Sequence, residues 1–126
     1  MHINHIALYV TDLKKSTDFY ENVMQLSSIP EPFKDGYHSW FQVSTGCQLH
    51  LIGGAKEKVN PIIHTHLAFT TSSIEMFVQR LTEARVEYGD VDGRKNTIQV
   101  RPDGIQQVFF QDPDGYWLEV NNDTAE

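Results

Sequence analysis

The stretch HIALYVTDLKKSTDFYENV, residues 5–23, has a counterpart 61 residues later in HLAFTTSSIEMFVQRLTEA, residues 66–84. Aligned this way, His5 falls on His66 and Ala7 falls on Ala68, and apolar positions continue to match along both stretches. Each stretch opens with residues typical of a strand and continues with apolar residues spaced as on one face of a helix. Because an internal repeat fixes the architecture, the chain is predicted to be two copies of one module.

Both copies carry signals for where the strand ends and the helix begins. Thr11 or Asp12 can cap the first helix, and Ser72 together with Glu75 is a possible capping box for the second. Three shorter strands are expected after each helix, because apolar and β-branched runs alternate with Gly- and Pro-containing turns. The expected strands are residues 3–10, 27–33, 38–43 and 47–53 in the first half, and 64–71, 86–91, 106–111 and 116–120 in the second.

The predicted fold is therefore α+β, with two tandem βαβββ modules in one domain of residues 1–126. The modules span residues 1–55 and 63–122, and a polar, proline-containing linker covers residues 56–62. We expect the strands to form a curved, partly closed mixed sheet with the helices outside. Such a sheet has a concave face, away from the helices, that must be filled.

Four polar residues are predicted to lie on that concave face, because side chains alternate along a strand. In the first module, His5 lies on the strand face opposite the one that carries Ile6, Leu8 and Val10. His50 lies between Leu49 and Leu51, which point to the helix, so His50 points to the other face. In the second module His66 and Glu119 occupy the corresponding places in the first and last strands.

A divalent metal ion would explain why these residues share one face. Burying three imidazoles and a carboxylate without partners costs several kcal/mol, and one cation supplies a partner for His5, His50, His66 and Glu119 together. This ligand set suits zinc, nickel, cobalt, iron(II) or manganese. The alternative is that each histidine is an ordinary hydrogen-bonded residue and Glu119 a solvated edge residue, but four such residues in equivalent places of a repeat favour the metal.

Further residues are candidates for lining a substrate pocket. Trp117 must share the face of Glu119, and His64 shares that of His66 or lies at the sheet's end. Trp40, with His38, would wall the cavity if it points inward, or Trp40 belongs to the core. Arg101 either meets a substrate carboxylate or lies in a solvated loop.

The composition disfavours several classes of binding partner. With 10 Lys and Arg against 17 Asp and Glu, the formal net charge is −7, which disfavours nucleic acid and anionic lipid as partners. The apolar runs are too short to span a membrane, and the first residues do not form a signal peptide. The single cysteine, Cys47, excludes an internal disulfide and fits a cytoplasmic protein.

Four segments of the chain resemble the vicinal oxygen chelate superfamily, which includes glyoxalase I, bleomycin-resistance proteins and extradiol dioxygenases. The segments are NHIALYVTDLKKSTDFYENVMQL, LHLIGG, HTHLAF and QDPDGYWLEV. The resemblance implies that His5, His50, His66 and Glu119 match the strand positions from which the superfamily draws metal ligands. It also implies a homodimer, in some members with each metal held by modules of two chains.

The resemblance makes a metal-dependent lyase or isomerase of glyoxalase type the leading expectation, acting on a small oxygenated substrate. In this reading Glu119 leaves the metal to act as a base, and His50 is either a fourth ligand or an acid/base partner. Glyoxalase I usually has Glu at the position of His50, and the superfamily's thiol transferases use the positions of His5, His66 and Glu119. The alternatives are an iron(II) extradiol-type dioxygenase and a non-catalytic protein that sequesters a small molecule such as a drug.

Overall fold

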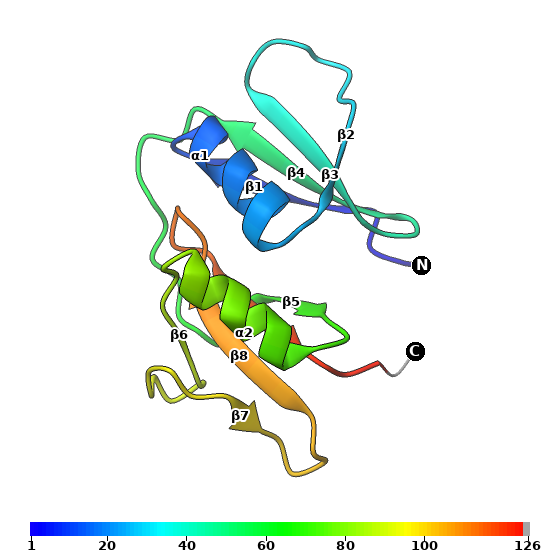
Figure 1. The fold of residues 1–126 in the computed structure, drawn as a ribbon. Helices are drawn as coiled ribbons and strands as arrows, with labels where there is room; N and C mark the ends of the chain where they lie inside the picture. Colours follow the sequence, from blue (N-terminus) through cyan, green and yellow to red (C-terminus); the bar gives the residue numbers. More distant parts are fainter. Residues whose placement is uncertain (125–126) are drawn as a thin grey trace. The chain divides into compact units, whose positions relative to one another are not determined.

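The computed structural model describes residues 1–124, and it divides the chain into two compact units, Met1–Lys58 and Val59–Glu126. Figure 1 shows a helix and a sheet in each unit. The α+β class predicted from the sequence is confirmed, because each unit has the order strand, helix, then further strands.

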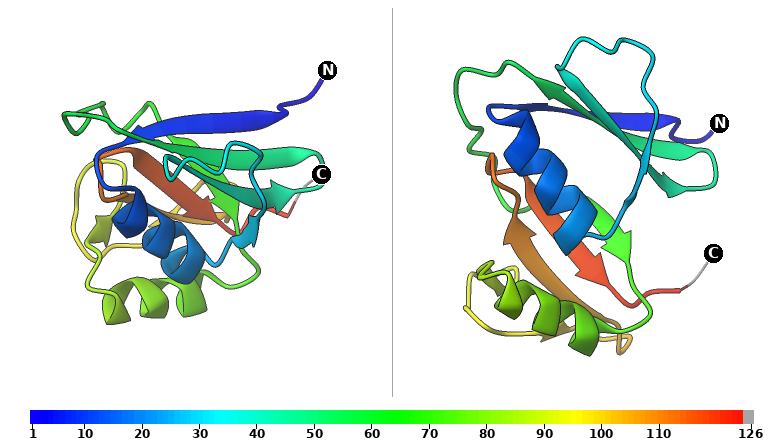
Figure 2. Two further views of the ribbon diagram at one scale, coloured as in Figure 1. Left: turned by 90° about the horizontal axis from the view of Figure 1, so that it is seen from above. Right: turned by 45° about the horizontal axis from the view of Figure 1, so that its top comes forward.

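The first unit holds a four-stranded sheet in the order β1-β4-β3-β2, in which β1 is parallel to β4 and the other pairs are antiparallel. The helix α1 packs against β3 and β4 and runs on into a π-helical turn, η1 (Figure 2). The elements are β1 (His5–Val10), α1 (Leu13–Asp18), η1 (Phe19–Val23), β2 (Ser27–Ile29), β3 (His38–Ser44) and β4 (Cys47–Gly53).

The second unit repeats this order in a sheet β5-β9-β8-β6, with β7 paired to β8. Here β5 is parallel to β9, as β1 is to β4, and Phe77 of α2 packs against Phe110 of β8 with ring centroids 5.5 Å apart. The elements are β5 (Leu67–Thr70), α2 (Ile74–Glu83), β6 (Tyr88–Gly89), β7 (Gln99–Val100), β8 (Gln106–Gln111) and β9 (Trp117–Asn121).

The register of the parallel pairs explains the repeated His-x-Ala. Ala7 is the partner of His50 in the first sheet, and Ala68 is the partner of Glu119 in the second. Each alanine is thus the strand neighbour of a longer polar side chain on the same face, and its small size leaves room for that side chain. The two units match at the level of individual strand partners.

The core of each unit lies between its helix and its sheet. Tyr20 of η1 and Phe41 of β3 are both fully buried, with ring centroids 6.4 Å apart, and Leu49 and Leu51 of β4 share that side. In the second unit Phe110, Leu118 and Val120 are buried on the corresponding side. The faces that carry His50 and Glu119 are the opposite ones, because side chains alternate along each strand.

Several predicted boundaries were wrong, for local reasons. The strand expected over residues 27–33 ends at Ile29, since Pro30 and Pro32 have no N–H for a ladder. Of residues 86–91 only Tyr88–Gly89 are a strand, because the Asp90 carboxylate accepts the backbone N–H groups of Asp92 and Arg94 and forms a loop. The strand β7 was not predicted.

The cap of the second helix was predicted one residue too early. Ser73, and not Ser72, is the N-cap of α2, and its Oγ accepts the N–H of Met76 at 3.2 Å. Glu75 therefore does not stand at the third helical position and completes no capping box. At the first helix Asp12 is the cap, since its Oδ1 accepts the N–H of Lys15 at 3.1 Å.

Replacing Ser73 by Ala is expected to lower the free energy of unfolding by about 1 kcal/mol, because one helix N–H loses its acceptor. The matched change Ser72→Ala should alter it by only a few tenths of a kcal/mol. Urea unfolding followed by circular dichroism measures both. Equal effects of the two changes would contradict this assignment of the cap.

None of the helices within residues 1–124 is long and apolar enough to cross a membrane.

Candidate functional site

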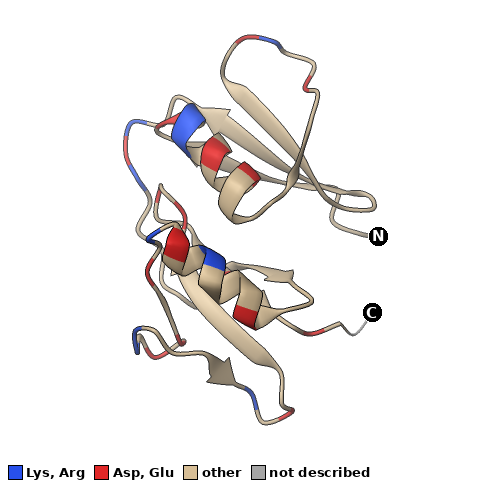
Figure 3. Ribbon diagram, in the orientation of Figure 1, with Lys and Arg blue, Asp and Glu red and all other residues tan. Residues whose placement is uncertain are grey.

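Glu119 stands out because it is the one charged residue in any strand within the described part of the chain. Within residues 1–124, the Lys, Arg and Asp residues and the other Glu residues lie on helices and in loops, and the strands are almost uncoloured in Figure 3. Glu119 is also buried, with 8% of its surface exposed. A buried carboxylate in the middle of a strand requires a partner.

His66 is the partner that the second unit provides. Its Nε2 lies 3.2 Å from Oε1 of Glu119, and its other nitrogen, Nδ1, lies 2.7 Å from the carbonyl oxygen of Ile63. A carbonyl oxygen only accepts hydrogen bonds, so Nδ1 carries a hydrogen. In the neutral imidazole, Nε2 then presents a lone pair toward the carboxylate.

Two electron-pair donors that face each other at this distance need a positive charge between them. Either a second proton makes His66 an imidazolium, or a cation is bound by Nε2 and Oε1 together. The hydrogen bond from Nδ1 to a backbone carbonyl is also the arrangement that normally orients a metal-binding histidine. The donor set of this pair therefore fits a divalent metal ion.

The second carboxylate oxygen of Glu119, Oε2, is also hydrogen-bonded. Asn121 donates from Nδ2 to Oε2 of Glu119 at 2.6 Å, and its own Oδ1 accepts the N–H of Asp123 at 3.0 Å. This second bond fixes the orientation of the amide, so that its NH₂ group faces the carboxylate. Oε1 remains for His66, whose ring also meets Phe109 edge-on at 5.3 Å.

In the first unit, His5 and His50 are neighbours in a stack of rings across three strands. The His50 ring lies between Trp40, with centroids 3.8 Å apart and planes at 3°, and His5, with centroids 4.3 Å apart. Trp40 is the strand partner of His50, so it lies on the face away from the helix. The stack restrains the imidazole of His50 from both sides.

Hydrogen bonds leave one nitrogen of each of these imidazoles available. Nε2 of His50 donates to Oε1 of Gln48 at 2.8 Å, and Nδ1 of His5 donates to Oδ1 of Asn4 at 2.8 Å. Burial lowers the pKa of His50, and the nearby His5 and His38 lower it further. His50 is therefore neutral at pH 7, which is the form that binds a metal or accepts a proton.

The four predicted ligands are thus found as two pairs, one in each unit. Residues 1–124 contain no group of three or more His, Cys, Asp or Glu side chains that could hold a metal ion. That all four bind one ion stays a prediction.

The candidate pocket residues have different surroundings. Trp117 shares the sheet with Glu119 and donates from Nε1 to the carbonyl of Pro61 at 3.1 Å, while His64 is exposed and precedes β5. Arg101 binds both oxygens of Asp103, and these hydrogen bonds, with smaller contributions from Asp123 and Glu119, raise its pKa. Arg101 therefore lies within electrostatic range of Glu119, although its guanidinium is hydrogen-bonded to Asp103 in the same turn.

Sequence reasoning assigned no role to the residues that orient the predicted ligands. Gln48 and Asn121 each lie two residues from the side chain that they hold, on the same face of the same strand. The alternation of a strand is the signal that could have found them.

The chain is similar in sequence to proteins of one family. The family model described as Glyoxalase/Bleomycin resistance protein/Dioxygenase superfamily matches residues 2–120. A metallothiol transferase FosB from Shouchella clausii is 32% identical over 125 residues, which cover 97% of this chain and 80% of that protein. Glyoxylase I 4 from Arabidopsis thaliana is 25% identical, covering 95% of this chain and 70% of that protein.

Solved structures show the same fold. Oxidase ChaP-H1 has a TM-score of 0.78 at 28% identity, covering 98% of this chain and 96% of that one. The fosfomycin resistance protein FosX from Listeria monocytogenes has a TM-score of 0.76 at 23% identity, covering 98% and 94%.

Proposed function

Because the chain belongs to the Glyoxalase/Bleomycin resistance protein/Dioxygenase superfamily, we propose that it is a metal-dependent lyase or isomerase of glyoxalase type. His5, His50, His66 and Glu119 are the proposed metal ligands, two from each unit. The ion would be zinc, nickel, cobalt, iron(II) or manganese, since imidazole and carboxylate suit all of these. The substrate would be a small molecule with two adjacent oxygens.

The single observation that carries the proposal is the pair formed by His66 and Glu119. Its two electron-pair donors face each other at 3.2 Å, and each is oriented from behind, by the Ile63 carbonyl and by the Asn121 amide. Hydrogen bonds of this kind behind the ligating atoms are the arrangement that orients metal-binding side chains.

When bound, a divalent ion would act as a Lewis acid that stabilises negative charge on the substrate oxygens. Glu119 would bind the ion through Oε1 and leave it to move a proton at that oxygen, while Asn121 donates a hydrogen bond to Oε2. His50 is held neutral and fixed between Trp40 and His5, so it is available as a ligand or as an acid/base partner. The hydrogen bonds of Glu119 and the packing of His50 support these proposed roles.

The test uses the zinc- or nickel-loaded protein with the hemithioacetal of methylglyoxal and a thiol, in deuterated water. We expect turnover together with incorporation of solvent deuterium next to the carbonyl, at a rate at least about 10²-fold above the metal-free protein. Elemental analysis in parallel gives the metal stoichiometry. A loaded protein that neither turns over nor exchanges hemithioacetals and α-hydroxycarbonyl compounds would refute the proposal.

A metallothiol transferase is the second candidate, because FosB from Shouchella clausii is 32% identical over almost the whole chain. The superfamily's thiol transferases use the positions of His5, His66 and Glu119 as ligands, without His50. Metal-dependent consumption of a thiol with an epoxide, and none with the hemithioacetal, would favour this candidate. Oxygen consumption by the iron(II)-loaded protein with catechols would instead favour a dioxygenase.

A further inference from the structure

We infer that His38, oriented by Asp35 and stacked on Phe33, is a general base that accepts a proton at Nε2 from a small flat molecule. His38 is in β3, two residues from Trp40 and therefore on the face that carries His50. The inference rests on the proposed function for the natural reaction, in which His38 would be a proton acceptor in addition to Glu119.

The carboxylate of Asp35 sets the tautomer of His38. Nδ1 of His38 lies 2.9 Å from Oδ1 of Asp35, and this hydrogen bond is the main cause that lowers the pKa of Asp35. An ionised carboxylate only accepts, so Nδ1 carries the hydrogen and Nε2 presents its lone pair. A histidine oriented in this way by a carboxylate is the usual arrangement of a catalytic base.

Hydrogen bonds within the loop before β3 hold Asp35 and His38 in position. Glu31 accepts the N–H groups of Phe33 and Lys34 at 2.7 and 2.9 Å, and Asp35 accepts the N–H of Tyr37 at 3.0 Å as well as His38. These bonds fix Phe33 so that its ring stacks on the His38 imidazole with centroids 4.3 Å apart. The His38 side chain is only 17% exposed.

The surroundings favour a flat, unsaturated molecule. Phe33 is 57% exposed although it is aromatic, and its ring meets Trp40 edge-on at 6.2 Å. The Phe33 ring, which is largely open to solvent beside the His38 imidazole, therefore suits a flat molecule.

In the inferred step, the imidazole takes a proton from an acidic C–H bond, and the bonding electrons stay on the molecule. His38 becomes an imidazolium stabilised by Asp35, and it returns the proton to the product or to water. The step needs no oxidant, and it does not itself require a metal. It can therefore be tested on metal-free protein.

The probe is 5-nitrobenzisoxazole, a flat molecule that loses its ring C–H proton to a base while its N–O bond opens to a cyanophenolate. The chelator-treated wild-type protein should convert it at least about 10²-fold faster than equimolar free imidazole. His38→Gln should lower this rate at least about tenfold, and Asp35→Asn by a smaller factor. The exposed His2 gives the matched control His2→Gln, which should keep the wild-type rate.

The tautomer is measured separately by ¹⁵N NMR, with circular dichroism to show that the variants fold. The wild type should carry the His38 proton on Nδ1, and Asp35→Asn should shift it toward Nε2. A folded His38→Gln variant that keeps the wild-type rate, or a wild-type His38 protonated on Nε2 alone, would overturn the inference.

Failure of the proposed function is distinguishable from these results. A metal-loaded protein that is inactive toward hemithioacetals but still converts the benzisoxazole through His38 would refute the lyase and support the base. His38→Gln should bind metal as the wild type does, because His38 is not among the proposed ligands.

Discussion

Replacing Glu119 by Gln is expected to weaken metal binding by at least about 10²-fold, because Gln keeps the shape of the side chain but loses its charge. The effect appears as lost stabilisation by metal. At a free metal concentration 100 times the wild-type Kd, the ion stabilises the wild-type protein by about 2.7 kcal/mol and the variant by only about 0.4 kcal/mol. Urea unfolding at matched metal concentrations measures this difference.

The same change should not destabilise the metal-free protein. The amide NH₂ group that Glu119→Gln introduces can donate to the lone pair of His66 Nε2, which in the wild type faces a carboxylate oxygen at 3.2 Å. A structural ion pair would behave in the opposite way, since its loss would lower stability without metal. The two readouts together separate a metal ligand from a salt bridge.

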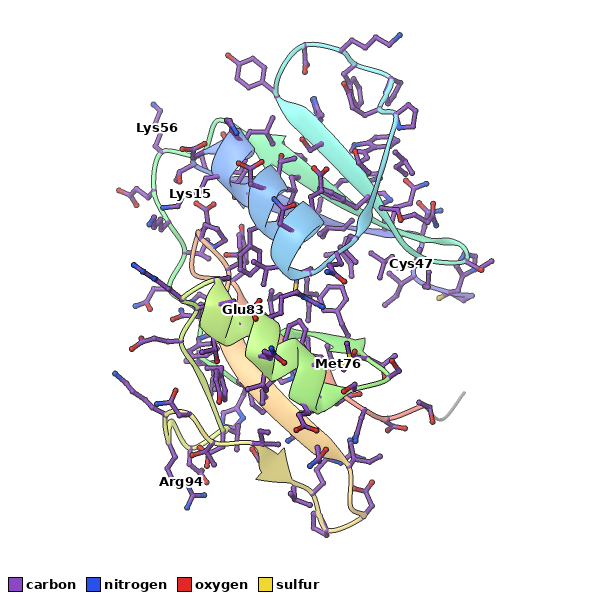
Figure 4. All side chains as sticks on the ribbon, in the orientation of Figure 1. Lys15, Cys47, Lys56, Met76, Glu83 and Arg94 are labelled. Atoms are coloured by element: carbon purple, nitrogen blue, oxygen red, sulfur yellow. The ribbon has the colours of Figure 1, made fainter. Side chains whose placement is uncertain are left out.

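Glu83 provides the control. It is exposed on α2, where Figure 4 labels it, and Glu83→Gln should leave both metal affinity and stability unchanged within experimental error. A Glu119→Gln variant that binds metal as tightly as the wild type would remove Glu119 from the ligand set.

Replacing Gly115 by Ala is expected to cost roughly 3 kcal/mol or more of unfolding free energy, through two effects that add. Gly115 has a φ of +97°, which costs an alanine about 1 kcal/mol or somewhat more. A Cβ at this position would also lie far inside van der Waals contact with the carbonyl oxygen of Val59. The backbone must therefore move, which places the change among the large single-residue effects.

Gly104 separates the two effects, because it ends a turn of similar sequence, RPDG against DPDG. Its φ is +88°, but a Cβ there would have no atom within 4 Å. Gly104→Ala should therefore cost only the backbone term, about 1 kcal/mol. Urea unfolding of the two variants gives the difference, and equal losses would show that the contact with Val59 can relax.

The Gly115 contact also bears on the candidate site. Val59 donates its N–H to the carbonyl of Asp114 at 3.0 Å, and Trp117 donates to the carbonyl of Pro61. These contacts fix residues 59–61, and two residues later Ile63 supplies the carbonyl that orients His66. We therefore expect Gly115→Ala to weaken metal binding as well as stability.

Much of the fold was predictable because its determinants are local. The apolar spacing of residues 5–23 and 66–84 identified both strand–helix units, and alternation placed Glu119 and Leu118 on opposite faces. Two of the errors arose where a side chain accepts backbone N–H groups. Asp90 takes two N–H groups that a strand would have used, and Ser73 caps a helix that Ser72 could have capped equally well by composition.

For the site, the sequence alone determined which residues share a face of the sheet. Both the alternation of side chains along a strand and the internal repeat can be recognised from the order of the residues. Those two signals were enough to select His5 with His50 and His66 with Glu119. Only tertiary structure decided which nitrogen of each imidazole is free, since that depends on partners such as the Ile63 carbonyl and the Gln48 amide. Hydrogen-bond geometry is set by positions to within a fraction of an ångström, and residue order does not encode distances on that scale.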